Sequence, residues 1–245
     1  MAEAPPISPT VMWHDVECGG YEADLPLWRE LARDAGDPVL EVGAGTGRVA
    51  LRLALAGHAV TALDHDPLLL SVLAARAAEA GLQVETVTAD AARFDLAGRD
   101  FALIAVPMQT IQLLDGPARA GFFACARRAL APGGLVALAL AERPEAFEAP
   151  GELPLPDLGE RDGWRFVSQP LAIRIGEASW RIERARQLIA PDGTRTNEAD
   201  VVELAALTPE DLAREGAAAG LRPAGARRVA ATPEHVGTEV VLLRG

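Results

Sequence analysis

The chain has 245 residues, of which 49% are hydrophobic and 24% charged, so it can bury a core without disulfides or metal ions. Its formal net charge of −12 argues against nucleic acid and anionic membranes as partners, because both favour a basic surface. All of its basic residues are arginine, which excludes lysine Schiff-base chemistry.

The cysteines and the N-terminal residues bear on metal binding and on the cellular location of the protein. Cys18 and Cys125 form no metal-spaced cluster, so we expect no metal site and reduced thiols. Residues 1–10 are rich in proline and are expected to be mobile, and they lack the basic and apolar segments of a signal peptide. The apolar runs are interrupted too often to span a bilayer. We therefore expect a cytoplasmic protein.

Hydrophobic periodicity predicts a helix over residues 22–35, followed by alternating strands and helices. The predicted strands cover residues 38–43, 59–64, 83–88, 101–106 and 135–140. The predicted helices between them cover residues 46–56, 67–80 and 117–130, and residues 89–100 form the least regular helical connection. Strands and helices in this order predict an α/β fold with a doubly wound, Rossmann-like parallel sheet.

The pattern changes after the fifth strand. Residues 142–162 are rich in Glu and Pro and are expected to form a linker, and three alternating stretches then predict an antiparallel β-meander. Thr208 and Pro209 open a helix that ends at Gly220, and two last strands follow near 223–230 and 238–244. We therefore expect three parts: an N-terminal helix and core (1–141), an inserted linker and flap (142–207), and a C-terminal helix and strand pair (208–245).

A glycine-rich loop follows the first strand: residues 41–47 read Glu-Val-Gly-Ala-Gly-Thr-Gly. Glycine lets the main chain turn tightly and lets a ligand approach it closely. The helix expected after the loop would present free N–H groups to the same space. Dinucleotides and S-adenosylmethionine (SAM) are two cofactors that bind such a loop.

Spacing alone leaves the dinucleotide alternative open. The GxGxxG pattern fails from Gly43, because position 48 is Arg. From Gly45 it places Ala50 at the last position, where Ala is tolerated. Glu41 argues the other way, because a carboxylate beside the loop would repel a pyrophosphate and would suit the amino group of a methionine moiety.

Acidic residues end the next two strands. Asp64 can accept hydrogen bonds from both ribose hydroxyls, which suits either cofactor. Asp90 could receive the exocyclic amine of adenine, and His65 could stack on the adenine ring. A loop glycine cluster with acids at two successive strand ends predicts a nucleoside-containing cofactor.

The order of glycine loop, two strand-end acids, apolar strand, helix and Leu-Ala-Pro-Gly-Gly-Leu resembles the class I SAM-dependent methyltransferases over residues 38–141. Residues 208–244 fit that family's reversed last hairpin. The resemblance implies a seven-stranded sheet whose last strand is antiparallel. It also implies that SAM contacts Tyr21, Glu41, Gly43, Ala44, Gly45, Thr46, Gly47, Asp64, His65, Asp90, Ala91, Val106 and Met108.

Methyl transfer needs alignment more than a catalytic base, so no catalytic residue is assigned. Residues 106–109 read Val-Pro-Met-Gln, which departs from the Asn/Asp-Pro-Pro-Tyr/Phe signature of enzymes that methylate DNA amino groups. The insertion after strand five resembles the flap of small-molecule N-methyltransferases. We therefore expect a SAM-dependent methyltransferase that acts on a small-molecule acceptor as a monomer or homodimer. An NAD(P)-dependent oxidoreductase and a non-catalytic SAM-binding protein remain alternatives.

Overall fold

The computed structural model describes residues 8–245, which form two compact units. The first unit joins the segment that ends at Tyr21 to Arg143–Ala206, and the second contains Glu22–Glu142 and Leu207–Gly245. The sequence-based division kept the N-terminal segment with the core, whereas its packing groups it with the insertion. Residues 1–10 were expected to be mobile, and residues 1–7 of that segment lie outside the described part. Pro9 begins a helix that the sequence did not predict.

The second unit is built on a seven-stranded sheet in the order β11-β12-β5-β4-β1-β2-β3. The strands are β1 (Val39–Val42), β2 (Val60–Asp64), β3 (Val84–Thr88), β4 (Phe101–Val106), β5 (Leu130–Ala141), β11 (Arg222–Val229) and β12 (Thr238–Arg244). Strands β1 to β5 pair in parallel, while β12 is antiparallel to both of its neighbours. The predicted doubly wound sheet with a reversed last strand is therefore confirmed.

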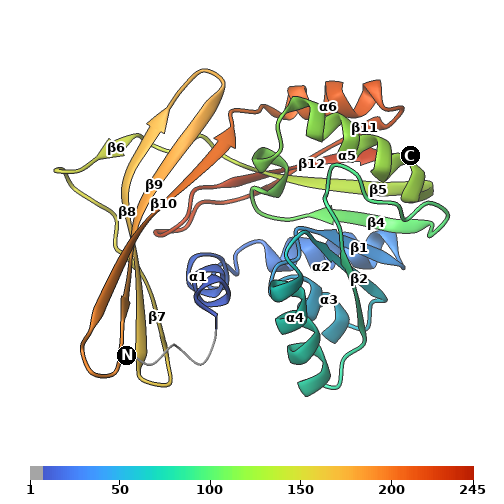
Figure 1. The fold of residues 1–245 in the computed structure, drawn as a ribbon. Helices are drawn as coiled ribbons and strands as arrows, with labels where there is room; N and C mark the ends of the chain where they lie inside the picture. Colours follow the sequence, from blue (N-terminus) through green and yellow to red (C-terminus); the bar gives the residue numbers. More distant parts are fainter. Residues whose placement is uncertain (1–7) are drawn as a thin grey trace. The chain divides into compact units, whose positions relative to one another are not determined.

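Helices cover both faces of this sheet (Figure 1). The helices of the unit are α2 (Leu25–Ala35), α3 (Ala50–Leu55), α4 (Pro67–Glu79), α5 (Gly116–Ala129), α6 (Pro209–Ala218) and the 3₁₀ helix η1 (Thr110–Leu113). Successive strand residues point to opposite faces. Val39 and Leu103 accordingly pack with α2, α3 and α4, whereas Leu40 and Ile104 pack with α5 and α6.

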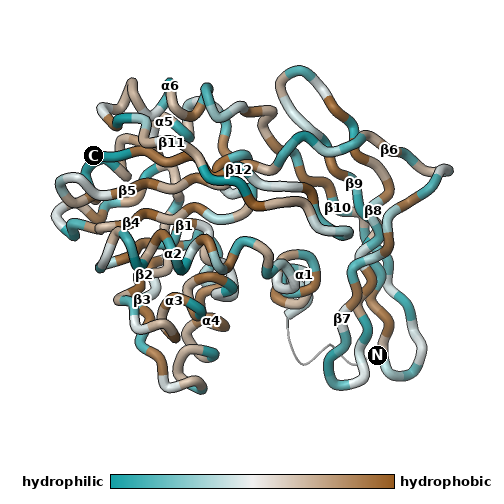
Figure 2. Tube along the Cα trace, turned by 180° about the vertical axis from the view of Figure 1, so that it is seen from behind, coloured by the Kyte–Doolittle hydropathy of each residue, from teal (hydrophilic) through white to brown (hydrophobic). Residues whose placement is uncertain are grey.

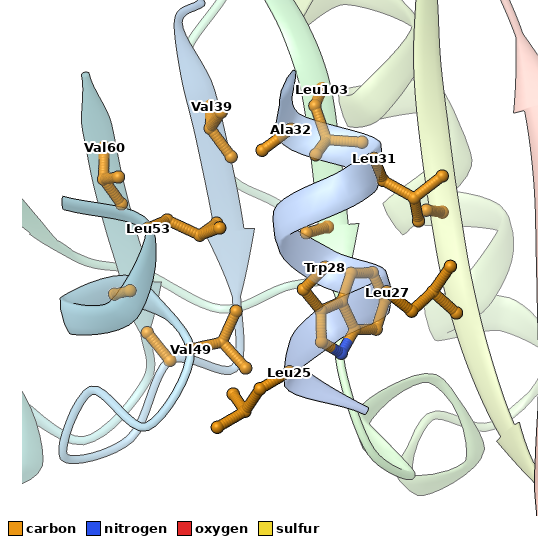
Figure 3. Close-up of a cluster of buried hydrophobic side chains, with 14 of the residues drawn as sticks. Leu25, Leu27, Trp28, Leu31, Ala32, Val39, Val49, Leu53, Val60 and Leu103 are labelled. Carbon is orange, nitrogen blue, oxygen red and sulfur yellow. The ribbon is translucent and has the colours of Figure 1, made fainter. Parts of the chain in front are cut away.

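The sheet has a hydrophobic core on each of its two faces, and both cores are almost wholly apolar. The central strands run brown, or hydrophobic, in Figure 2, as expected for parallel strands buried on both faces. Figure 3 shows the core beneath α2, where Trp28, Leu31 and Leu53 lie against the strands, and all three are at most 5% exposed. This packing fixes α2 and α3 on the face that also carries the side chain of Glu41.

Two connections differ from the prediction. Helix α3 begins at Ala50 rather than at residue 46, because Gly45 and Gly47 adopt φ values of +53° and +96° that no right-handed helix contains. Residues 89–100 contain no helix. That segment turns at Asp90 and is held on α5, where Phe94 packs against Phe122.

The order of the central strands creates a switch point. After β1 the chain adds β2 and β3 on one side, and then β4 and β5 on the other. The carboxyl ends of β1 and β4 lie at this switch point, which is where doubly wound sheets bind ligands. The glycine loop follows β1 at this edge, and Pro107–Gln109 follow β4 at the same edge.

In its described residues, the first unit is a five-stranded antiparallel sheet with one helix, α1 (Pro9–Cys18). Its strands are β6 (Phe147–Glu148), β7 (Asp157–Arg161), β8 (Trp164–Ile175), β9 (Ser179–Ile189) and β10 (Arg195–Ala205). The predicted meander corresponds to β8–β10, but the expected linker contains β6 and β7, which both pair with β8. Trp13 of α1 packs edge-on against Phe166, with ring centroids 5.0 Å apart.

A substitution pair on α3 tests the core. Leu53→Ala removes a side chain that is 0% exposed, and we expect it to lower the free energy of unfolding by about 2–5 kcal/mol. Leu55→Ala, on the same helix, removes a side chain that is 66% exposed and should change stability by less than about 0.5 kcal/mol. Urea unfolding followed by circular dichroism measures both. Equal losses would contradict the described packing.

Candidate cofactor site

The glycine loop is folded onto the end of β2. The N–H groups of Gly43 and Ala44 both donate to the Leu63 carbonyl oxygen, at 2.9 and 3.0 Å. The N–H of Gly45 donates to Asp64 Oδ2 at 2.8 Å, and that of Gly47 donates to the Ala44 carbonyl oxygen at 2.9 Å. The loop is therefore held in shape by the protein itself.

Two of the loop glycines are required by packing. A Cβ added at Gly43, where φ is +75°, would lie 2.5 Å from Thr110 Cγ2 and 2.6 Å from Thr110 Oγ1. At Gly47 it would lie 2.7 Å from Leu73 Cγ. Thr110 belongs to η1 and donates its hydroxyl to the Pro107 carbonyl oxygen at 3.0 Å. The absent side chain at Gly43 thus makes room for the segment after β4, a reason that the sequence did not reveal.

Asp64 connects the loop to the end of β2. Its side chain is buried, and besides the Gly45 N–H it accepts the N–H of Asp66 at Oδ1, at 3.0 Å. His65 Nδ1 lies 3.2 Å from the same Oδ1, with its own side chain 85% exposed. Each carboxylate oxygen has two lone-pair sites, so Asp64 keeps the capacity to accept hydroxyl groups from a ligand.

Asp90 leaves the neighbouring strand at the same edge, since Thr88 is the register partner of Asp64. Its Oδ1 accepts the N–H of Ala92 at 2.8 Å, and its Oδ2 accepts Arg93 Nε at 2.9 Å. The Ala92 N–H bond, followed by the bond from Arg93, holds the pKa of Asp90 below its ordinary value. Asp90 and the adjacent Ala91 are only partly buried.

Glu41 is a buried carboxyl group on β1. It is 2% exposed, and within residues 8–245 its Oε2 atom has no hydrogen-bond partner. Burial raises the pKa of Glu41 to about 8, against the opposing effects of Arg48 and of the Ala50 N–H. A buried polar atom without a partner is rare in native proteins and costs free energy, so it marks a place where a donor is expected.

Sequence reasoning missed the groups beside Glu41. Asp24, 1% exposed, accepts the two Nη atoms of Arg48 at 2.6 and 2.8 Å. It also accepts the indole N–H of Trp28 at 2.8 Å. An arginine directly after the glycine loop was the one signal in the sequence, but its partner lies 24 residues earlier, at the N-cap of α2.

The other residues predicted to contact SAM differ in how far their side chains are buried. The side chains of Ala44, Thr46 and Val106 are buried, and that of Val106 belongs to the core beneath α5, so a ligand could meet only the main chain of Val106. Met108 is half-buried and has a φ of +54°, an uncommon backbone region for a side chain of this size. Tyr21 is buried but belongs to the first unit, and its role in cofactor binding stays a prediction.

The polar groups at this site suit one of the two candidate cofactors better than the other. Glu41 and Asp64, with Asp90 on the next strand, offer carboxyl oxygens, while the neighbouring Arg48 and Arg93 already pair with Asp24 and Asp90. The Oε2 of Glu41, which no residue in 8–245 contacts by a hydrogen bond, fits an ammonium group, and Asp64 fits ribose hydroxyls. The residues present therefore fit SAM, which is cationic and carries no phosphate, better than a dinucleotide.

Within residues 8–245, neither a metal-binding cluster nor a membrane-spanning helix is present. No group of three or more His, Cys, Asp or Glu side chains in that part is arranged to hold a metal ion. None of the helices there has the length and apolar character needed to cross a membrane.

The packing of Thr110 against Gly43 can be tested by adding one methyl group. Gly43→Ala should lower the free energy of unfolding by about 2–4 kcal/mol, since it combines a positive φ with a steric overlap. Gly57→Ala is the matched control, because its φ is +94° and nothing lies within 4 Å, so it should cost about 1–2 kcal/mol. Adding Thr110→Ala to Gly43→Ala should recover part of the loss, and no recovery would refute the contact.

The ionisation of Glu41 predicts a pH-dependent stability. Unfolded Glu titrates near 4.3, so between pH 5 and 8 the folded protein holds a proton that the unfolded chain has released. Glu41 therefore lowers stability progressively as the pH rises toward 8. The stability of Glu41→Gln relative to the parent should increase over this range in urea titrations. The same substitution at the exposed Glu79 is the control, and a pH-independent difference for Glu41→Gln would refute the assignment.

Residues 39–134, which contain the loop and both strand-end acids, match the model of a family described as a methyltransferase domain. Curated relatives match shorter stretches. An uncharacterised protein of Mycobacterium tuberculosis is 39% identical over 82 residues, or 34% of this chain and 29% of that protein. Ribosomal RNA small subunit methyltransferase A of Anaeromyxobacter dehalogenans is 44% identical over 77 residues, or 31% and 26%. The chain thus spans less than a third of the curated relatives that it matches.

Solved structures match nearly the whole chain. SAM-bound CalS10, an amino pentose methyltransferase from Micromonospora echinaspora, is 21% identical with a TM-score of 0.73, and the match covers 100% of both chains. The sugar N-methyltransferase KedS8 from a Streptoalloteichus species is 20% identical with a TM-score of 0.72, covering 100% of this chain and 96% of that one. The glycopeptide N-methyltransferase MtfA, complexed with sinefungin, is 26% identical with a TM-score of 0.58, covering 98% and 99%. Residues 39–134 are thus similar to the methyltransferase-domain family, and the chain shares its fold with solved SAM-dependent methyltransferases.

Proposed function

We propose that the protein transfers a methyl group from SAM to a small-molecule acceptor. The proposal rests on the position of the family match, which contains almost all of the predicted cofactor residues. The stretch matching the methyltransferase-domain model, residues 39–134, holds every predicted cofactor residue except Tyr21. Within it, a buried carboxyl oxygen of Glu41, without a partner among the described residues, lies directly before the glycine loop.

Each cofactor group has a proposed partner in the second unit. Glu41 receives the ammonium group of the methionine moiety, Asp64 the ribose hydroxyls, and Asp90 with Ala91 the adenine. The exposed His65 ring is free to cover the adenine face, and Met108 borders the methionine end. When bound, SAM supplies a methyl group already activated by the sulfonium, so the chain's own residues have to bind, orient and exclude water.

The small-molecule acceptor is supported by chemistry and by likeness. The net charge of −12 opposes a nucleic-acid substrate, although one curated relative acts on ribosomal RNA over a match of 31% of this chain. The segment after β4 reads Val-Pro-Met-Gln, unlike the signature of DNA amino methylation. Among the similar structures, CalS10 and KedS8 act on sugars and MtfA on a glycopeptide. A cytoplasmic monomer or homodimer completes the proposal.

Cofactor binding tests the site. We expect purified protein to bind SAM with micromolar affinity by isothermal calorimetry, and Asp64→Asn to weaken binding at least tenfold, because Asn offers one acceptor oxygen instead of two. The matched control is Asp95→Asn, an exposed acid five residues beyond Asp90, which should leave affinity unchanged. Equal effects of the two substitutions would refute the assignment of Asp64.

The alternatives give different results. Mass spectrometry of protein denatured directly after purification identifies a co-purified cofactor, and NADH fluorescence titration detects a dinucleotide site. Binding of NADH without SAM would replace the proposal by an oxidoreductase. Binding of SAM without turnover of a panel of amino sugars and other small amines and alcohols would favour a non-catalytic SAM-binding protein.

A further inference from the structure

A buried ion pair joins the start of α2 to the end of the glycine loop. Asp24 is the N-cap residue of α2, yet its side chain makes no capping bond to that helix. Instead it accepts both Nη atoms of Arg48, the residue that directly follows Gly47, together with the indole N–H of Trp28. The side chains of Arg48 and Asp24 are 10% and 2% exposed.

Such a pair is poorly explained by stability alone. Removing two charges from water costs free energy that their attraction often only balances, and a buried pair is frequently no better than apolar packing. Its geometry is nevertheless specific, because the planar guanidinium meets the carboxylate at two points. The pair therefore ties the residue that follows the loop to the N-cap of α2 at two points.

The same two charges surround Glu41. The ionised groups that act on its carboxyl are Arg48 from the loop, Asp24 from α2 and Asp64 from the end of β2. Arg48 favours ionisation of Glu41, whereas Asp24 and Asp64 oppose it. Since Asp24 already neutralises Arg48 by direct contact, Glu41 lacks a full counter-ion while its Oε2 has no partner among the described residues.

We propose that Asp24 and Arg48 are positioning residues that anchor the glycine loop and withhold a counter-ion from Glu41, reserving its Oε2 for the cationic group of the cofactor. The inference rests on the proposed function, because it takes the ammonium group of SAM as that cation. It implies that binding is coupled to a proton: the neutral carboxyl of Glu41 loses its proton to solvent as the ammonium group arrives.

The test uses S-adenosylhomocysteine, which carries the same amino-acid group and transfers no methyl. Calorimetric titrations at pH 6 to 8, in buffers of different ionisation enthalpy, give the number of protons released per ligand bound. We expect the parent to release close to one proton at pH 7, and Glu41→Gln to provide the baseline. The titration of the ligand's own amine is common to all variants and cancels in the comparison.

The two positioning residues should act in opposite directions. Asp24→Asn frees the charge of Arg48 to act on Glu41, and should move the midpoint of proton release down by about one pH unit. Arg48→Gln should move it up by a similar amount. The double variant removes both charges without leaving one unpaired, and should restore a midpoint near that of the parent. Arg52→Gln, an exposed arginine on α3, is the control and should change nothing.

Several outcomes would overturn the inference. If Asp24→Asn and Arg48→Gln weaken binding equally at every pH, the pair has only a structural role. If the parent binds S-adenosylhomocysteine without releasing a proton, Glu41 does not receive the ammonium group, while the proposed function stands. If the folded parent binds neither this ligand nor SAM, the proposed function fails and the inference with it. If Arg48→Gln fails to fold, Asp24→Asn and the double variant still decide the question.

Discussion

One carboxyl group, placed in the middle of a buried parallel sheet, constrains much of the second unit. Glu41 sits on β1, between β2 and β4, on the face that otherwise holds aliphatic side chains. Its burial is opposed by desolvation, and the neighbouring charges only partly offset that cost. Arg48, Asp24 and the indole of Trp28 are arranged around this position, so that the start of α2 and the loop after β1 are held together. This unfavourable burial at a central place is the observation on which the proposed ammonium site rests.

The glycine loop has to leave room for neighbouring side chains and also to bond to the end of β2. A glycine pattern in the sequence does not separate these two requirements. Gly43 and Gly47 are small because Thr110 and Leu73 fill the space where a side chain would stand. The N–H groups of Gly43 and Ala44 are engaged by the end of β2, and so is that of Gly45 through Asp64. The loop therefore does not act as a free cradle of N–H donors beside a helix terminus, since α3 starts only at Ala50. What it offers a ligand is a rigid edge bordered by acids.

The two units carry different amounts of functional information. The methyltransferase-domain match lies wholly in the second unit, where the carboxyl groups stand at the ends of neighbouring parallel strands. The first unit, with α1 packed on an antiparallel sheet, matches solved sugar and glycopeptide methyltransferases in fold, at identities of 20–26%. Fold similarity at this level does not determine a substrate. SAM as the methyl donor is therefore better supported than any particular methyl acceptor.

The sequence by itself determined the order of strands and helices in the core, because burial on both faces and helical periodicity are properties of short segments. It also placed Glu41, Asp64 and Asp90 at one edge, since parallel strands end on the same side. Only the tertiary structure decided that Asp24 pairs with Arg48, that Thr110 lies against Gly43, and that residues 89–100 fold onto α5 instead of forming a helix. It also assigned α1 to the inserted sheet and formed β6 and β7 within the expected linker. These features depend on contacts between segments far apart in the chain, which no local pattern encodes.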